Sequence, residues 1–407
     1  MDRIGLYLNA MSGKRLLALD DAIGKNFEDV KSFGAQQSKT EPIPDILIQI
    51  ALEGDDGALW TGLRRFYLKD IVDKAFDPGD AAYMPKQPTM LSEAALTDFL
   101  NTLLSGEPDA ERAVLVLGGH ADGAGVVLDD FPALKQLYAS SAALVPTIHE
   151  DIADVTPHWL SSQEFVNAMK TIPRDHDQKR LGIIAFDACE NASLEIATEV
   201  APYAHYLVAS ETGSPSEGWD YADWPSSVVG AKPDAGAAAM GMVKSYATRN
   251  SSPLQPRASL TGLKLDAVDE VCAAVRALSD MVLVDDTKLS QLAKVRELFV
   301  PLPEREFFRV DVGFFFEKLG STQGIDSGLR DAANKIVKAV QALVDGRFWS
   351  TENAGVSGVS VVFPGRKLEF LSSWKDVYMD RQYFPRFKDK TRWHEVLVAL
   401  YVKSRES

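Results

Sequence analysis

The sequence predicts an α/β fold in which a mostly parallel β-sheet is flanked by helices. Five short runs of the chain are almost continuously apolar, which is typical of strands that are buried on both faces. These runs cover residues 3–9, 45–52, 113–119, 181–187 and 206–211. Helical patterns lie between several of them, and strands that alternate with helices in this way usually pair in parallel.

Two of the intervening helices can be placed. In the first, Ser92 is a candidate N-cap, and large apolar residues recur at the helical period between residues 96 and 104. The second is expected over residues 191–201, directly after the fourth strand. Right-handed crossovers are expected for such strand–helix–strand units.

The second half of the chain is richer in helical patterns. Helices are expected around residues 264–278 and 329–344 and at the end, over 391–401, with one clear strand at 358–364. We therefore divide the chain into a core, residues 1–255, and a C-terminal helical region, residues 256–407, which we expect to be integral to the same unit.

Three polar segments predict exposed loops, at residues 76–88, 129–180 and 212–233. The segment 129–180 is the longest, and it separates the third strand from the fourth. A loop of that length in a compact domain is usually functional or flexible.

The composition excludes several classes of protein. The chain has 407 residues, 43 basic and 58 acidic, and a formal net charge of −15, which argues against nucleic acid and against a membrane surface as partners. No apolar run of membrane-spanning length and no signal peptide is present, so the chain as given is expected to be cytoplasmic, or secreted if a signal was removed. The two cysteines form no disulfide framework and no CxxC zinc site.

The ends of two predicted strands carry residues that could form a catalytic site. The third strand leads into His120 within a Gly-rich turn, and the fourth leads into Cys189 just before the helix expected at 191–201. In doubly wound sheets, sites form at the carboxyl ends of the strands, and thiol chemistry needs a base or acid near the sulfur. A following helix dipole favours the thiolate, and glycines beside His120 let backbone N–H groups approach a substrate carbonyl.

Other interpretations of these residues stay open at this point. An isolated cysteine is usually a small buried apolar residue, and we assign that role to Cys272 on its amphipathic helix. A histidine beside glycines is often only a turn residue. No dinucleotide fingerprint, phosphate-binding loop or G-x-S-x-G elbow competes with the thiol site.

The residues at these two strand ends resemble the clostripain family of cysteine peptidases, in the clan of caspases, gingipains and legumains. That family pairs a histidine in a Gly-rich turn with a cysteine in an F-D-A-C segment, and this chain has LGGHADGAG at 117–125 and IIAFDAC at 183–189. The similarity continues through EGWDY at 217–221 and GVSVVFP at 358–364. The resemblance implies a caspase-like sheet with an α-rich C-terminal extension packed on it.

The resemblance also implies roles for individual residues. Cys189 is the expected nucleophile and His120 the imidazole that protonates the leaving amine, with the backbone N–H groups of Cys189 and Ala121 forming the oxyanion hole. Many relatives have glycine where this chain has Ala121, which has less freedom for a positive φ. The substrate pocket is expected to be lined by Asp187, as the acidic floor, and by Ser210, Glu211 and Glu217.

Relatives often mature by cutting themselves between the histidine and cysteine strands. Candidate sites in this chain follow Lys135, Arg174, Lys179 and Arg180. Some relatives depend on calcium, but no spaced ligand set is visible among Asp129, Asp130, Asp151 and Asp154, so no metal or other cofactor is expected to be required.

The predicted function is that of a cysteine endopeptidase that cleaves protein or peptide substrates after Arg or Lys through a thioester acyl-enzyme. Two alternatives remain, an inactive caspase-like regulatory or binding module and an active peptidase with a different preference for the residue before the cleaved bond. The sequence makes no prediction of the oligomeric state.

Overall fold

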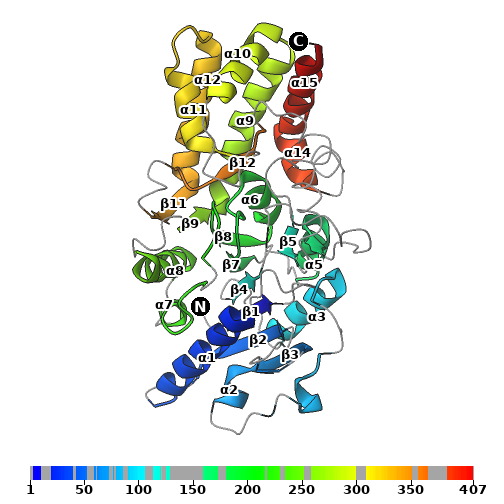
Figure 1. Ribbon diagram of the computed structural model, residues 1–407, viewed down its shortest axis with the longest axis vertical. Helices are drawn as coiled ribbons and strands as arrows, with labels where there is room; N and C mark the ends of the chain where they lie inside the picture. The colour runs from blue at the N-terminus through cyan, green and yellow to red at the C-terminus, as the bar shows by residue number, and fades with distance from the viewer. Residues whose placement is uncertain are drawn as a thin grey trace, which may run out of the picture.

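The computed structural model describes residues 3–10, 20–39, 43–52, 59–60, 62–72, 77, 79–85, 90–105, 113–119, 121, 125–128, 159–172, 180–215, 218–229, 234–251, 258–298, 309–350, 356–364 and 383–406. Its centre is an eight-stranded sheet with the strand order β11-β9-β8-β7-β4-β1-β2-β3 (Figure 1). The α/β fold with a mostly parallel sheet flanked by helices is confirmed.

The parallel centre of the sheet consists of the five predicted strands. They are β1 (Arg3–Asn9), β2 (Asp45–Leu52), β4 (Ala113–Gly118), β7 (Leu181–Asp187) and β8 (Ala204–Ala209). Three strands that the apolar pattern did not reveal extend it in antiparallel pairing, namely β3 (Gly62–Tyr67), β9 (Ser259–Lys264) and β11 (Val344–Trp349).

Helices cover both faces of the sheet. One face packs against α3 (Glu93–Leu103), α5 (Ser162–Lys170) and α6 (Leu194–Val200), and the other against α1 (Asp20–Gln37), α2 (Leu68–Ile71), α7 (Trp224–Val228) and α8 (Ala235–Asn250). Successive residues of the central strands enter opposite clusters, so that Leu115 and Ile184 face the first layer while Val114 and Ile183 face the second. This burial on both faces explains the continuous apolar runs.

A group of helices lies beyond the β11 end of the sheet, near the C-terminus (Figure 1). It contains α9 (Val268–Leu283), α10 (Asp286–Leu298), α11 (Val312–Ser321), α12 (Ser327–Leu343), α14 (Pro385–Thr391) and α15 (Trp393–Glu406). The small antiparallel pair of β10 (Arg309–Asp311) and β12 (Ser360–Val362) lies between these helices and α6. Because β9 and β11 follow residue 255 in the chain, the sheet extends across the predicted division at 255/256.

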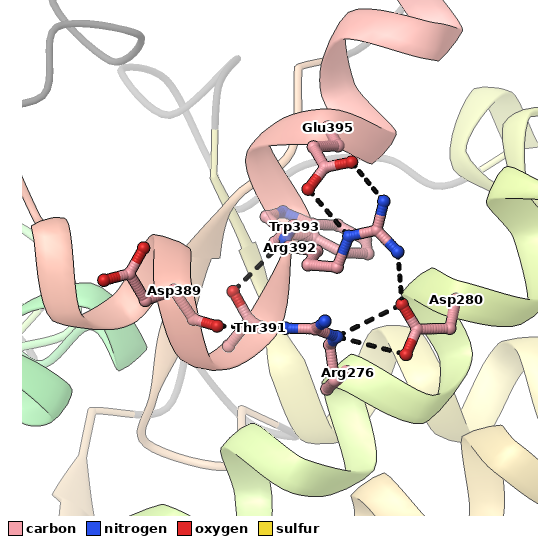
Figure 2. A network of polar contacts seen from close by, with 7 residues as sticks. All are labelled: Arg276, Asp280, Asp389, Thr391, Arg392, Trp393 and Glu395. Carbon is pink, nitrogen blue, oxygen red and sulfur yellow. Dashed lines mark hydrogen bonds and ion pairs between the residues drawn. The ribbon is translucent and has the colours of Figure 1, made fainter.

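A polar network joins α9 to the last two helices (Figure 2). Arg392, between α14 and α15, donates through Nη1 to Asp280 Oδ1 at 2.6 Å and through Nε to Glu395 Oε1 at 2.7 Å. Arg276 donates through Nε to Asp280 at 3.1 Å and through Nη1 to the Asp389 carbonyl at 3.0 Å. The network ties the end of the chain to α9, which packs on α6.

The prediction of one uninterrupted loop over residues 129–180 is wrong in part. Residues 159–161 form β6, which pairs with β5 (Gly125–Leu128), and α5 follows it. A capping box starts α5, since Ser161 Oγ accepts the Glu164 N–H while the Glu164 carboxylate accepts the Ser161 N–H. Phe165 and Met169 are buried on its inner face. The prediction of a loop over residues 212–233 is also wrong in part, because this segment contains α7.

Within the described part of the chain, no helix is both long enough and apolar enough to cross a membrane.

Candidate active site

The two strand ends singled out in the sequence lie next to each other in the sheet. β4 and β7 pair in parallel with Gly118 opposite Asp187, and the Gly119 N–H donates to the Asp187 carbonyl at 3.2 Å. Cys189 comes two residues after Asp187, just as His120 comes two residues after Gly118. His120 itself lies outside the described residues, while its neighbours Gly119 and Ala121 lie within them. The predicted adjacency of the two strands is therefore confirmed.

The turn after β4 requires glycine. Gly119 has a φ of +145°, and a Cβ atom there would lie 2.8 Å from the carbonyl oxygen of Asn9, at the end of β1. Both the backbone angle and the close approach exclude a side chain. The chain therefore turns sharply just before the histidine, at the carboxyl edge of the sheet.

Cys189 presents a half-buried thiol. Its Sγ accepts a hydrogen bond from the backbone N–H of Ser214 at 3.2 Å, and the Ser214 hydroxyl donates to the Ala188 carbonyl at 3.2 Å. The loop after β8 is thus bound to the turn after β7 by two contacts. A backbone N–H that points at sulfur stabilises the thiolate more than the thiol.

The helix whose dipole is expected to act on Cys189 begins later than predicted. The helix after the cysteine begins at Leu194 rather than at residue 191, and its N-cap Ser193 accepts the Ile196 N–H at 3.2 Å. The dipole effect falls off within the first turn, and Cys189 lies four residues before the N-cap. The helix therefore begins later than predicted, its effect on Cys189 stays a prediction, and the Ser214 N–H is a donor to the sulfur that the sequence did not predict.

The residue after the nucleophile candidate has an unusual backbone. Glu190 has a φ of +60°, in the left-handed region that non-glycine residues avoid, and its N–H donates to the Thr212 carbonyl at 3.1 Å. Its carboxylate lies 3.8 Å from Nε of Arg309, a side chain that is only 2% exposed. The turn after β7 is therefore fixed from both its backbone and its side chain.

Asp187 lies beside this turn with a half-buried carboxylate. Its Oδ2 accepts the Tyr221 hydroxyl at 3.0 Å and the Trp219 N–H at 3.4 Å. Burial raises the pKa of Asp187 to about 6, against the lowering effect of these two donors and of the Arg249 charge. Gly218 has a φ of +60°, and a Cβ there would come within 2.7 Å of Asp187 Oδ2, so the chain passes very close to the carboxylate.

Ser210 and Glu211 are more deeply buried than Asp187. Ser210 is 0% exposed, and its hydroxyl donates to the Thr212 carbonyl at 2.8 Å. Glu211 is 1% exposed, and its Oε2 accepts the Gly358 N–H at 3.1 Å. Asp311 approaches the same N–H at 3.3 Å. The predicted role of Ser210 and Glu211 in substrate binding stays a prediction, and Glu217 lies outside the described residues.

The candidate processing sites fall mostly outside the described part of the chain. Lys135, Arg174 and Lys179 are not described, whereas Arg180 is. The Arg180 guanidinium pairs with Asp266 Oδ1 at 2.8 Å and lies 2.8 Å from His205 Nδ1. Leu181 then enters β7, where its N–H donates to the Tyr203 carbonyl at 2.7 Å.

Cys272 differs from Cys189 in every respect that matters for reactivity. It is 1% exposed, its Sγ lies 3.2 Å from the Thr198 hydroxyl, and burial raises its pKa to about 11. A buried thiol of this kind is an inert packing group.

Among the described residues there is no group of three or more side chains that could hold a metal ion. The acids considered for calcium, Asp129, Asp130, Asp151 and Asp154, lie outside them.

The helix that follows the cysteine is anchored to late segments of the chain by two buried carboxylates. Glu195 Oε1 accepts the Val362 N–H at 2.8 Å, and Glu199 Oε1 accepts the Phe387 N–H at 2.9 Å. Glu195 is 0% and Glu199 3% exposed. Since the two residues are one helical turn apart, a single face of α6 holds both β12 and α14.

Sequence reasoning missed three residues that shape the site, namely Ser214, Tyr221 and Arg309. Ser214 reaches the Cys189 sulfur through its backbone N–H, a contact that leaves no residue-type signal in the sequence. Tyr221 lies in the EGWDY segment that marked the resemblance, but its bond to Asp187 depends on how the loop folds back. Arg309 comes from a segment 120 residues after Cys189, and nothing local in the sequence links the two.

The structure resembles solved cysteine peptidases over almost its whole length. It matches the inactive zymogen of a C11 protease from Parabacteroides distasonis with a TM-score of 0.64 and 16% identity, over 96% of this chain and 98% of that one. It matches a secreted C11 cysteine protease from Bacteroides thetaiotaomicron, in complex with an irreversible peptide inhibitor, with a TM-score of 0.62 and 15% identity, over 96% and 99% of the two chains. At this identity the likeness establishes the fold.

The fold is the one found in these solved cysteine peptidases, and in this chain it carries the thiol of Cys189 just after the strand β7. The family model of the clostripain family matches residues 158–399, more than half of the chain. The chain therefore belongs to the clostripain family and is a cysteine-type peptidase. No curated protein matches it in sequence.

Proposed function

We propose that the protein is an endopeptidase that hydrolyses peptide bonds after Arg or Lys, with Cys189 as nucleophile and His120 as general acid. The observation that supports this most directly is the parallel pairing of β4 and β7, with Gly118 opposite Asp187, because it aligns the two strand ends that lead to the histidine and the cysteine. The Ser214 N–H on the Cys189 sulfur adds a donor that favours the reactive thiolate.

In the proposed reaction, the Cys189 sulfur attacks the carbonyl carbon of the scissile bond. The carbonyl oxygen becomes an oxyanion that accepts the backbone N–H groups of Cys189 and Ala121. His120 then protonates the departing amine as the C–N bond breaks, which leaves a thioester. Water attacks the thioester, the carboxylic acid departs, and the thiol is restored.

Asp187 is the residue proposed to give the enzyme its preference for Arg or Lys before the scissile bond. Its carboxylate is held in place by Tyr221 and Trp219, and it stays half-buried, where a charge-assisted bond to guanidinium or ammonium is strong. A bound cation would in turn favour the charged form of Asp187. Substrates with basic residues are accordingly the proposed partners.

The test compares the wild-type chain with Cys189→Ala, His120→Ala and Cys272→Ala on fluorogenic peptides ending in Arg, Lys, Asp or Leu. We expect turnover of the Arg and Lys peptides by the wild type and by Cys272→Ala, and none by the other two variants. Turnover of none of the peptides by the wild type would point to a regulatory module. Turnover of the Asp or Leu peptide alone would overturn the role of Asp187.

We also propose that the chain cuts itself between β4 and β7. Because Arg180 is engaged by Asp266 just before a buried strand begins, Lys135, Arg174 and Lys179 are the preferred sites. Mass spectrometry of the purified wild type should find fragments ending at one of them, and the Cys189→Ala chain should stay intact. Identical intact chains in both samples would contradict self-processing.

The proposed reaction uses no metal or other cofactor. Peptide turnover should therefore persist in EDTA at a rate close to that without chelator. Loss of turnover on chelation, restored by added calcium, would contradict this proposal.

A further inference from the structure

One buried arginine from the C-terminal half of the chain reaches the turn that carries the nucleophile candidate. Arg309, the first residue of β10, is 2% exposed. Its Nε lies 3.8 Å from Glu190 Oε2, its Nη1 lies 3.7 Å from Glu195 Oε2, and Nη1 also donates to Ser360 Oγ at 3.4 Å. The guanidinium thus links the turn after β7, the helix α6 and the strand β12.

Of the residues that Arg309 contacts, Glu190 is the one next to the candidate nucleophile. It directly follows Cys189 and has a φ of +60°. Such angles in non-glycine residues persist only where the surrounding structure enforces them, and they concentrate at functional sites. The strand β7 before the turn and the helix α6 after it are both fixed in the core. Because both ends of the short segment between them are fixed, a change of φ at Glu190 must be compensated by other dihedral angles of the segment. These include the angles of Ala188 and Cys189, which orient the peptide that carries the Cys189 N–H.

Two contacts favour this conformation of Glu190, the bond of its N–H to the Thr212 carbonyl and the ion pair with Arg309. The first fixes one peptide plane. The second restrains the side chain, in surroundings that screen the two charges less than water does, because the arginine side chain is only 2% and the glutamate side chain only 17% exposed.

We propose that Arg309 is a positioning residue of the peptidase, which holds Glu190 in its left-handed conformation and thereby keeps the Cys189 N–H directed at the oxyanion. This proposal rests on the proposed function, in which that N–H stabilises the oxyanion. In this proposal Arg309 acts through Glu190, so its effect is on the rate of acyl transfer rather than on the reactivity of the thiol.

Two reactions of Cys189, alkylation and peptide hydrolysis, distinguish an effect on the oxyanion from an effect on the reactivity of the thiol. Alkylation of Cys189 by iodoacetamide forms an S–C bond while iodide leaves, and it develops no oxyanion. Peptide hydrolysis passes through one. Loss of an oxyanion donor lowers kcat by about 10²–10³-fold, so a misdirected donor should lower it by about tenfold or more. We therefore expect Arg309→Met to lower kcat by that amount, with KM and the alkylation rate each within about threefold of wild type.

Glycine at position 190 supplies the rescue. Glycine adopts positive φ without a steric cost, so it should keep the turn without the ion pair. In the Arg309→Met background, Glu190→Gly should restore most of the lost kcat, whereas the matched Glu190→Gln should restore none. Melting curves are recorded for all chains, so that kcat is compared between folded proteins.

A wild-type kcat in folded Arg309→Met, or equal kcat in the two double variants, overturns the proposed positioning role of Arg309. An alkylation rate that falls in parallel with kcat also overturns it, because Arg309 would then act on the thiol. If Arg309→Met does not fold, Arg309→Lys and Glu190→Gln replace it, and a wild-type kcat in both is the contradicting result. Failure of the wild type to cleave any peptide refutes the proposed function itself.

Discussion

The backbone N–H of Ser214 donates to the sulfur of Cys189 at 3.2 Å. The donor comes from the loop after β8, so the neighbouring strand supplies the polar contact that the sequence pattern assigned to a helix. A donor on the main chain cannot be removed by an ordinary side-chain substitution, but proline removes it. This gives a direct test of its effect on the thiol.

Ser214→Pro should raise the pH at which Cys189 becomes reactive. A hydrogen bond to a charged group contributes about 1.5–3 kcal/mol, so its loss should shift the midpoint of alkylation against pH upward by about one unit or more. Iodoacetamide labelling of Cys189 followed by mass spectrometry measures the midpoint. Ser214→Ala, which keeps the N–H, is the control. The same midpoint in both variants would contradict a role for this donor.

Recognition of a basic residue should weaken in acid. Burial raises the pKa of Asp187 to about 6, so the carboxylate is charged above that pH and neutral below it. KM for an Arg peptide should therefore rise as the pH falls through about 6, while a peptide with a neutral residue at that position shows no such change. Asp187→Asn should raise KM for the Arg peptide above about pH 6, to the level that the wild type reaches in acid, and should remove the transition.

Tyr221 tunes this transition. Its hydroxyl donates to Asp187 at 3.0 Å and lowers the carboxyl pKa. In Tyr221→Phe the same rise in KM should therefore begin at a higher pH than in the wild type. A transition at the wild-type pH, measured on the same Arg peptide, would show that the hydroxyl bond has no effect on Asp187.

Glu199 should make the fold less stable as the pH rises. Burial raises its pKa to about 7, although the Phe387 and Arg386 N–H groups oppose this. The folded chain then binds the proton more tightly than the unfolded chain, so this contribution is complete below the ordinary pKa near 4.5 and is lost as the pH rises to about 7.

The change corresponds to about 3 kcal/mol in the free energy of unfolding. Glu199→Gln carries no titrating proton and keeps an oxygen for the Phe387 N–H. Its melting temperature relative to wild type should therefore increase from pH 5 to pH 8. A difference between the two chains that is constant with pH would contradict this assignment.

The polar network of Figure 2 allows backbone and ionic effects to be separated at Arg392. This residue has a φ of +53° at the junction of α14 and α15. Arg392→Gly and Arg392→Ala both remove the pairs with Asp280 and Glu395, but only glycine accepts the angle without strain. Arg392→Ala should thus have the lower melting temperature, and equal values would contradict a strained junction.

The sequence predicts the centre of the fold well, because strands such as β4 and β7 are buried on both faces and are apolar along almost their whole length. It does not reveal α8, whose Ala- and Gly-rich sequence has only a weak apolar stripe. Nor does it reveal β11, an edge strand with charged residues. Both depend on tertiary packing rather than on a local pattern.

The candidate site also has one part that the sequence predicts and one part that it does not. The strand-end position of Cys189 and the acid at Asp187 follow from motifs within a few residues of each other. The Ser214 donor to Cys189 and the ion pair of Arg309 with Glu190 are contacts between residues 25 and 119 positions apart, and no local pattern encodes such a contact.

The anchoring of α6 by β12 has a consequence for biosynthesis. A growing chain emerges from the ribosome with Cys189 well before Arg309 and Val362, yet the guanidinium and the N–H that engage Glu195 come from those later residues. A nascent chain that ends between them has the proposed nucleophile but not the contacts that hold the following helix. These contacts can form only when nearly the whole polypeptide has been made.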